Sequence, residues 1–114
     1  MIQLGYFTID TADLDKARAF YGALFGWTFD EAQSHTAYAH VAGGEPSFGF
    51  VKVERPKNNE HLYFRVEDVD ALCERVVELG GKAAIPAETS SGLTVAVADD
   101  QGVAFSLWQP APEL

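Results

Sequence analysis

The chain has 114 residues and a net charge of −9 at neutral pH, and 47% of it is hydrophobic and 12% aromatic. This composition is typical of a folded globular protein, and the acidic balance argues against a nucleic-acid-binding surface, which needs clustered lysine and arginine. The N-terminus has neither a basic nor an apolar signal region, and no segment approaches the roughly 20 apolar residues of a membrane span. We therefore expect a cytoplasmic protein that binds neither nucleic acid nor membrane.

The first half of the chain predicts a strand, a helix and three more strands. Residues 2–10 alternate, with Phe7 and Ile9 on one face, as in a strand that packs one side on a core. Asp13 is a suitable N-cap for a helix with an apolar stripe, and Gly26 suits its end. Further strands are expected at residues 27–30, 37–41 and 47–53, with a polar loop at 31–36 and a turn at 43–46.

The same pattern returns in the second half. Asp68 lies 55 residues after Asp13, follows a strand-like segment at residues 61–66, and begins a helix that we expect to run to Leu79. The single cysteine, Cys73, lies beside the apolar stripe of this helix, where an unreactive, half-buried thiol is expected. The remaining expected segments are strands at 83–87, 93–98 and 103–108, a loop at 88–92 and a turn at 99–102.

These segments predict one α+β domain over residues 1–114, built from two βαβββ modules. Module one covers residues 1–54, a polar linker covers 55–60, module two covers 61–109, and a tail covers 110–114. In each module a helix would cover one face of a sheet and leave the other face open. Two open faces side by side would form a curled mixed sheet around a cleft.

Besides the repeat, the chain contains the motifs Phe20-Tyr-Gly22, Leu24-Phe-Gly-Trp27, Phe64-Arg-Val-Glu-Asp68, and Asp99-Asp-Gln-Gly102 followed by Phe105-Ser-Leu-Trp-Gln109. Together they resemble the vicinal oxygen chelate superfamily, which includes glyoxalase I, extradiol dioxygenases, fosfomycin-resistance enzymes and bleomycin-resistance proteins. The resemblance covers nearly the whole chain and implies paired βαβββ modules around a cleft. It does not by itself give the function, because this fold supports lyases, oxygenases, transferases and binding proteins.

The resemblance also implies where a divalent metal would bind in the metalloenzymes of the superfamily. Their ligands, usually His, Gln or Glu, come from the first and last strands of the modules, and the matching positions here are Tyr6, Gly49, His61 and Ser106. Only His61 is a usual ligand, and tyrosine and serine are weak partners for a divalent ion at neutral pH. We predict no metal site and no cofactor, and leave open whether His40 or His61 binds a metal.

The departure from the metal pattern favours a metal-free binding protein. The chain resembles the bleomycin-resistance branch, whose members sequester a bulky, basic, aromatic drug in grooves of a dimer, although Arg65 opposes a cationic ligand. Tyrosine and tryptophan are typical of small-molecule clefts. We therefore predict sequestration of an aromatic or antibiotic-like ligand by the residues of the open faces, namely Tyr6, Thr8, His61, Tyr63, Arg65, Ser106 and Trp108.

An alternative is a lyase-like or dioxygenase-like enzyme with a divergent metal site, or with a metal-free acid–base site at His61. Histidine is the side chain whose ordinary pKa lies near neutrality, but no catalytic residue is assigned from the sequence. Exposed sheet edges, and the dimers common among small members of the superfamily, predict a homodimer. The identity of the ligand, and whether the cleft lies within one chain or between two, stay open.

Overall fold

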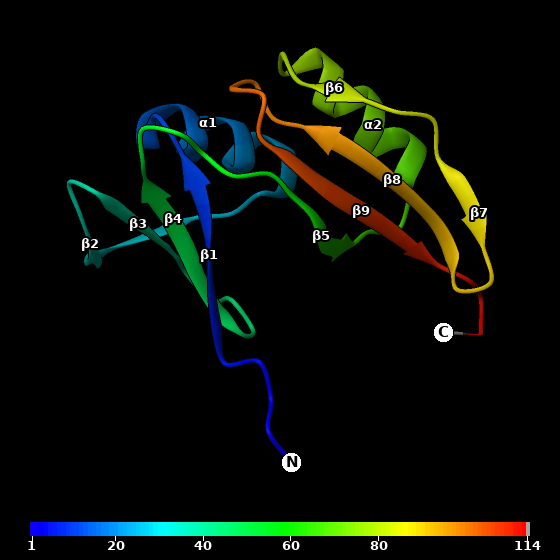
Figure 1. Ribbon diagram of the computed structural model, residues 1–114, viewed down its shortest axis with the longest axis horizontal. Helices are drawn as coiled ribbons and strands as arrows, with labels where there is room; N and C mark the ends of the chain where they lie inside the picture. Colours follow the sequence, from blue (N-terminus) through cyan, green and yellow to red (C-terminus); the bar gives the residue numbers. More distant parts are fainter. Residues whose placement is uncertain (114) are drawn as a thin grey trace. The chain divides into compact units, whose positions relative to one another are not determined.

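The computed structural model describes residues 1–113 (Figure 1). The chain forms two compact units, one spanning Met1–Pro56 and one that begins at Lys57, and each has one helix and one mixed sheet. Leu114, the last residue of the predicted tail, lies outside the described residues. No helix in the described part of the chain combines the length and the apolar character that crossing a membrane requires.

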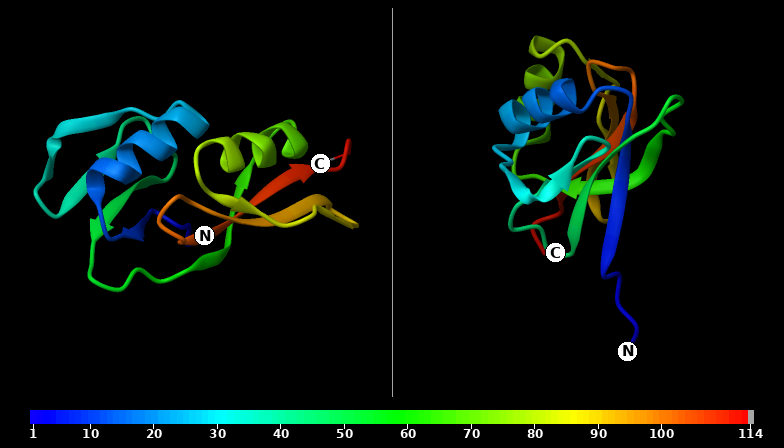
Figure 2. Two further views of the ribbon diagram at one scale, coloured as in Figure 1. Left: turned by 90° about the horizontal axis from the view of Figure 1, so that it is seen from above. Right: turned by 90° about the vertical axis from the view of Figure 1, so that its left-hand side faces the viewer.

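The first unit has a four-stranded sheet with one helix against it. Strand β1 pairs in parallel with β4, and β4 pairs antiparallel with β3, which pairs antiparallel with β2. Figure 2 shows α1 along one face of this sheet. The elements are β1 (Tyr6–Thr11), α1 (Leu14–Phe25), β2 (Phe29–His35), β3 (Tyr38–Val41) and β4 (Ser47–Lys52).

The second unit repeats this arrangement. Strand β5 pairs in parallel with β9, and β9 pairs antiparallel with β8, which pairs with both β6 and β7. The elements are β5 (Asn59–Arg65), α2 (Val69–Glu78), β6 (Lys82–Ala83), β7 (Ala87–Thr89), β8 (Gly92–Ala98) and β9 (Ala104–Pro110).

The register confirms the predicted repeat. In the first sheet Thr8 lies opposite Gly49, and in the second Tyr63 lies opposite Ser106, each across a parallel pair of first and last strands. Both helices begin as predicted, because the side chains of Asp13 and Asp68 each accept a hydrogen bond from a backbone N–H of the first turn at 3.1 Å. The predicted α+β class with two mixed-sheet modules is therefore confirmed.

The core of the first unit is aromatic. Tyr21 of α1 is 1% exposed, and its ring centroid lies 4.8 Å from that of Phe50 and 5.7 Å from that of Trp27. Phe48, on the same face of β4 as Phe50, stacks on Phe7 of β1 at 4.7 Å. The alternation in β1 and β4 therefore places the phenylalanines on the helix side, as predicted, and leaves the other face of the sheet for polar and small residues.

Residues 31–36, predicted to form a loop, lie largely in strand β2, so that prediction was wrong. The pairing of β2 with β3 shifts between Asp30 and His35, as in a β-bulge. The Ser34 hydroxyl bridges this irregular part, donating to the Asp30 carbonyl at 2.7 Å and accepting from the His40 N–H at 2.9 Å. Polar side chains here replace ladder hydrogen bonds, which is why their composition resembles that of a loop.

Other strand boundaries also differ from the predictions. The first strand begins at Tyr6 rather than at Ile2, since β4 begins at Ser47, opposite Tyr6, and offers no partner to the preceding residues. The strand predicted at 83–87 is divided into β6 and β7, and the loop predicted at 88–92 is partly strand β7. Strand β5 begins at Asn59, within the predicted linker.

The turn between β8 and β9 depends on one buried carboxylate. Asp99 is 3% exposed, and its Oδ1 accepts hydrogen bonds from the N–H groups of Gln101 at 2.9 Å and Val103 at 3.1 Å. We expect Asp99→Ala to lower the free energy of unfolding by about 2 kcal/mol, because these donors lose their partner. Urea denaturation measures the loss. The control Asp99→Asn keeps an acceptor oxygen, and an equal loss in both variants would contradict this explanation.

Candidate functional site

The open face of the second sheet brings together most of the predicted site residues. Side chains of directly opposed residues share a face of a sheet. One row across β5, β9 and β8 contains Tyr63, Ser106 and Ala96, and the next contains Arg65, Trp108 and Thr94. Four predicted site residues therefore lie in two neighbouring rows.

Two pockets of about 320 and 390 Å³ lie on this part of the second unit. Both are lined by Tyr63 and Thr94, so they adjoin at these two residues. We call the two together the Tyr63 groove. The first is also lined by Glu60, His61, Ile85, Ala87, Val95, Ala96 and Ser106, and the second by Thr89, Ser91 and Trp108.

Hydrogen bonds hold two walls of the Tyr63 groove in place. The buried Ser106 hydroxyl donates to the Glu60 carbonyl at 2.6 Å, and Trp108 Nε1 donates to the Ser91 carbonyl at 3.0 Å. The Arg65 guanidinium carbon lies 5.6 Å from the centroid of the Trp108 ring, a cation–π distance. The indole is therefore fixed from two sides and presents a preformed flat surface, as expected of a small-molecule site.

The residues at the four metal-ligand positions of the superfamily do not fit a divalent ion. Gly49 has no side chain, the Ser106 hydroxyl is used in its bond to Glu60, and the Tyr6 hydroxyl donates to that of Tyr38 at 2.9 Å. Within residues 1–113 no group of three or more His, Cys, Asp or Glu residues is placed to hold a metal ion. Several such ligands must act together to bind a metal tightly.

Tyr6 and Thr8 lie on the open face of the first sheet, apart in the sequence from the other five predicted site residues. Thr8, Gly49 and His40 form one row there, and the hydroxyl of Tyr38 lies 2.5 Å from His40 Nδ1. Tyr38 was absent from the predicted site. Its alternation with His40 along β3 was the available signal, because it places both side chains on the face that Gly49 leaves free.

The pKa of Tyr38 is raised to about 12, first by burial and then by the hydrogen bond and charge of Tyr6. A raised pKa in the folded state means that this tyrosine contributes stability that is fully present below about pH 10 and is lost as the pH rises towards about 12. Because Tyr21 is also buried, the ultraviolet titration of tyrosinate is compared between the wild type and Tyr38→Phe, and we expect the variant to lose tyrosinate that forms at about pH 12. An unchanged tyrosinate signal in this pH range would contradict the assignment.

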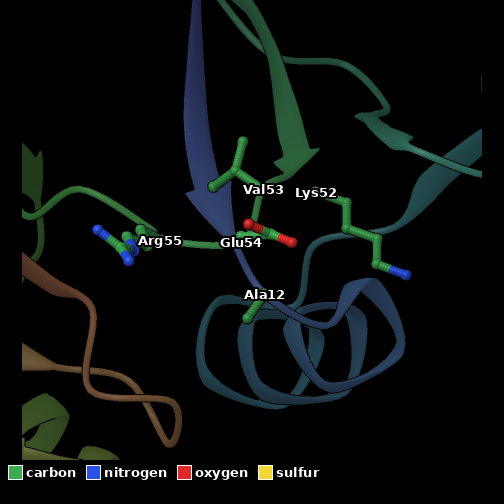
Figure 3. Close-up of a pocket in the computed structure, with 5 residues that line it drawn as sticks. All are labelled: Ala12, Lys52, Val53, Glu54 and Arg55. Atoms are coloured by element: carbon green, nitrogen blue, oxygen red, sulfur yellow. The ribbon is translucent and has the colours of Figure 1, made fainter.

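A larger pocket of about 650 Å³ lies at the end of the first sheet (Figure 3). Its charged side chains do not converge, since Lys52 and Arg55 point in different directions with Glu54 between them. It is lined besides by Ala12 and Val53 and has no aromatic wall. The Tyr63 groove is the better candidate although each of its two pockets is smaller, because it combines fixed aromatic surface with hydroxyl groups.

Comparisons with known proteins give the same family as the motifs. The glyoxalase-like domain family matches residues 6–108. A putative glyoxylase of Mycobacterium tuberculosis, CFP32, is 35% identical over 107 residues, which cover 87% of this chain and 41% of that protein. The anthracycline biosynthesis protein DnrV of Streptomyces peucetius is 28% identical over 125 residues, which cover 91% of this chain and 46% of DnrV.

Among solved structures, the antibiotic-binding protein TnmS3 of Streptomyces sp. CB03234 is 26% identical with a TM-score of 0.75, over 97% of this chain and 98% of that one. The chain thus spans less than half the length of the two curated relatives but nearly all of TnmS3. The family match covers β1 through most of β9, the segment that contains both repeated units. The chain belongs to the glyoxalase-like family of the vicinal oxygen chelate superfamily.

Proposed function

We propose that this chain binds a small aromatic or antibiotic-like molecule in the Tyr63 groove without the help of a metal. The observation that carries the proposal is the pair of adjoining pockets walled by Tyr63 and by the fixed indole of Trp108. Each pocket falls within the range of volumes, about 300–1,000 Å³, that drug-sized ligands occupy. Aromatic walls of this kind favour a planar ligand that stacks on them.

The polar groups of the groove favour a neutral or acidic ligand over a cationic one. Thr89, Ser91 and Thr94 line its second pocket beside Trp108, and their hydroxyls both donate and accept hydrogen bonds. The Arg65 guanidinium lies over the same tryptophan, where it would repel a cation. The proposal therefore departs from the basic drug that the bleomycin-resistance resemblance implied, while keeping an aromatic ligand.

Two of the related proteins support the proposal. TnmS3 is described as an antibiotic-binding protein and DnrV as an anthracycline biosynthesis protein, and both descriptions concern those proteins. That this chain binds a polycyclic aromatic compound is our proposal, which extends these descriptions to it. Because the chain covers 46% of DnrV, any role like that of the whole relative is part of the proposal.

A ligand panel tests the proposal. We expect at least one planar polycyclic compound to change tryptophan fluorescence and to bind in calorimetry, and Thr94→Trp to weaken binding by at least about tenfold, because the new indole occupies the junction of the two pockets. Thr28→Trp, at an exposed position of the first unit, is the matched control and should bind as the wild type does. A panel without binding, or equal affinity for the Thr94→Trp variant, would contradict the proposal.

A second candidate function is acid–base catalysis by His61 without a metal. His61 is exposed and lines the same pocket as Tyr63 and Ser106, so a bound ligand would lie beside an imidazole that can exchange protons. His61→Ala should then abolish turnover of a bound compound while its binding and the circular dichroism spectrum persist. The divergent-metal alternative requires bound metal, and elemental analysis below about one tenth of an equivalent would exclude it.

Three further expectations stay proposals. We propose that the chain forms a homodimer, that modules 1–54 and 61–109 unfold as one domain through linker 55–60, and that the protein is cytoplasmic. Sedimentation equilibrium, the number of unfolding transitions and cell fractionation test them in turn. Contacts of Tyr6, Thr8 and Arg65 with a ligand are likewise proposed, and nuclear magnetic resonance shifts during the panel titration would detect them.

A further inference from the structure

Three side chains on the open face of the first sheet form a continuous hydrogen-bonded chain. The Tyr6 hydroxyl donates to the Tyr38 hydroxyl at 2.9 Å, and that hydroxyl lies 2.5 Å from His40 Nδ1. We call these three residues the Tyr–Tyr–His chain. They come from β1 and β3, on either side of β4.

Gly49 of β4 makes room for this chain. A Cβ atom at Gly49 would lie 2.5 Å from the Tyr38 hydroxyl and 2.6 Å from the Ala39 carbonyl, distances that real Cβ atoms do not show. The Tyr38 side chain therefore passes directly over the glycine and reaches Tyr6 on the far side. Any larger residue at this position would break the contact between the two hydroxyls.

The second sheet has no equivalent chain, although its backbone follows the same plan. Ser106 replaces Gly49 there, and its partner on β8 is Ala96 where the first sheet has His40. Thr94 likewise takes the place of Tyr38. The Tyr–Tyr–His chain is therefore specific to the first module and does not follow from the repeated fold.

The order of donors gives the chain a direction. A hydroxyl group has one hydrogen. Tyr6 uses its hydrogen on Tyr38, so Tyr38 directs its own to His40 Nδ1, which acts as the acceptor when the imidazole carries its proton on Nε2. Tyr6 is 51% exposed, and its oxygen keeps acceptor capacity on the outer side. A hydroxyl that approaches from solvent would thus donate to Tyr6.

We propose that the Tyr–Tyr–His chain is a proton-accepting site for an acidic hydroxyl, a phenol or an enol, on a small molecule. The ligand O–H gives its proton to the Tyr6 oxygen, Tyr6 gives its own to Tyr38, and Tyr38 gives its own to His40 Nδ1. Three O–H bonds break, while two O–H bonds and one N–H bond form. The products are a ligand oxyanion and an imidazolium, so charge and protons balance.

The titratable groups around the Tyr–Tyr–His chain come from three strands. Asp30 of β2 is the cross-strand partner of His40, and its carboxylate accepts hydrogen bonds from the Ala32 N–H and from Gln33 Nε2. The other titratable groups on this face are His35, whose ring lies 5.7 Å from that of Tyr38, Tyr6, and Asp10 of β1, which lies in the same row as Tyr38. Strand β4 contributes only Ser47, Gly49 and Val51 there, none of which titrates. Imidazole has an ordinary pKa of about 6.5, which limits the ligand to acidic hydroxyls.

The test uses 4-nitrophenol, a phenol whose anion absorbs visible light and whose neutral form does not. At about pH 6.5 we expect the wild-type protein to raise the phenolate absorption of the probe in a saturable way. Tyr6→Phe and Tyr38→Phe should each reduce this rise by at least about tenfold, because each removes one hydroxyl and keeps the ring. His35→Gln is the control, since it removes a neighbouring imidazole that is not part of the Tyr–Tyr–His chain. This variant should raise the phenolate absorption as much as the wild type does.

Two results would overturn the proposal. One is an undiminished phenolate signal in folded Tyr6→Phe or Tyr38→Phe protein, and the other is the absence of any added phenolate with the wild type. Circular dichroism verifies the fold of each variant, and ¹⁵N resonance of His40 in the wild type provides a second measurement, with Nδ1 becoming protonated as the probe binds. The proposal does not rest on ligand binding in the Tyr63 groove. The Tyr–Tyr–His chain lies on the first sheet, and 4-nitrophenol reports its own ionisation.

Discussion

Replacing Phe50 with alanine should lower the free energy of unfolding by about 3–5 kcal/mol. Phe50 is 0% exposed, and its ring centroid lies 4.8 Å from Tyr21, 6.1 Å from Phe29 and 6.2 Å from Trp27. Truncation removes the ring that these three share. The cavity remains, because the backbone of β4 is held between β1 and β3 and cannot move inward.

Phe25→Ala is the matched control for this variant. Phe25 lies in the same aromatic cluster, at 4.8 Å from Trp27, but it is only half-buried at the end of α1. Phe25→Ala should lower the free energy of unfolding by clearly less than Phe50→Ala does, because water and neighbouring side chains can fill the space. Urea denaturation followed by circular dichroism measures both. Equal losses in the two variants, or a loss below about 1 kcal/mol for Phe50→Ala, would show that this core repacks freely.

Gly92→Ala should be destabilising by about 2–5 kcal/mol, from backbone strain and steric overlap together. Gly92 has a φ of 133°, which side-chain-bearing residues rarely adopt. A Cβ atom there would lie 2.1 Å from the Gln109 carbonyl and 2.7 Å from the Ala111 N–H nitrogen. Both are backbone atoms of the segment opposite β8, so no side chain can rotate away to relieve the overlap.

Gly102→Ala separates the two contributions. Gly102 also has a positive φ, 83°, but a Cβ atom there would meet nothing within 4 Å. This variant should show the cost of strain alone, about 1–3 kcal/mol. Thermal unfolding of both variants provides the comparison. If Gly92→Ala costs no more than Gly102→Ala, the opposing backbone must be able to move apart at the end of β8.

The sequence was sufficient for the fold because its strongest signals are local and occur twice. Asp13 and Asp68 are N-caps in both the pattern and the structure, and the spacing between them located both modules. The alternation of Phe48, Gly49 and Phe50 indicated which face of β4 packs against the helix and which face is open. Such patterns depend on neighbours two to four positions away, and these are visible in a single chain.

The two sites could not be predicted in full from the sequence, because they depend on tertiary contacts that no local sequence pattern reveals. The Tyr63 groove depends on Thr94 of β8 and on the Ser91 carbonyl that holds Trp108, and neither residue has a distinctive neighbourhood in the sequence. The Tyr–Tyr–His chain joins residues 32 positions apart across a glycine. The bulge in β2 was missed for a related reason, since its hydrogen bonds run through the Ser34 side chain and its composition matched that of a loop.

The division of the edge strand of the second sheet bears on how the rim of the Tyr63 groove can change. Residues 84–86 separate β6 from β7, and Ile85 is 91% exposed at the border of the Tyr63 groove. The Ala84 N–H still donates to the Ala96 carbonyl of β8, whereas Ile85 and Pro86 belong to no strand, so exchanges at these two positions leave the pairing with β8 intact. Natural variation and directed evolution can therefore reshape one rim of the groove there at little cost to stability, while Tyr63, Trp108 and the strands beneath them stay unchanged.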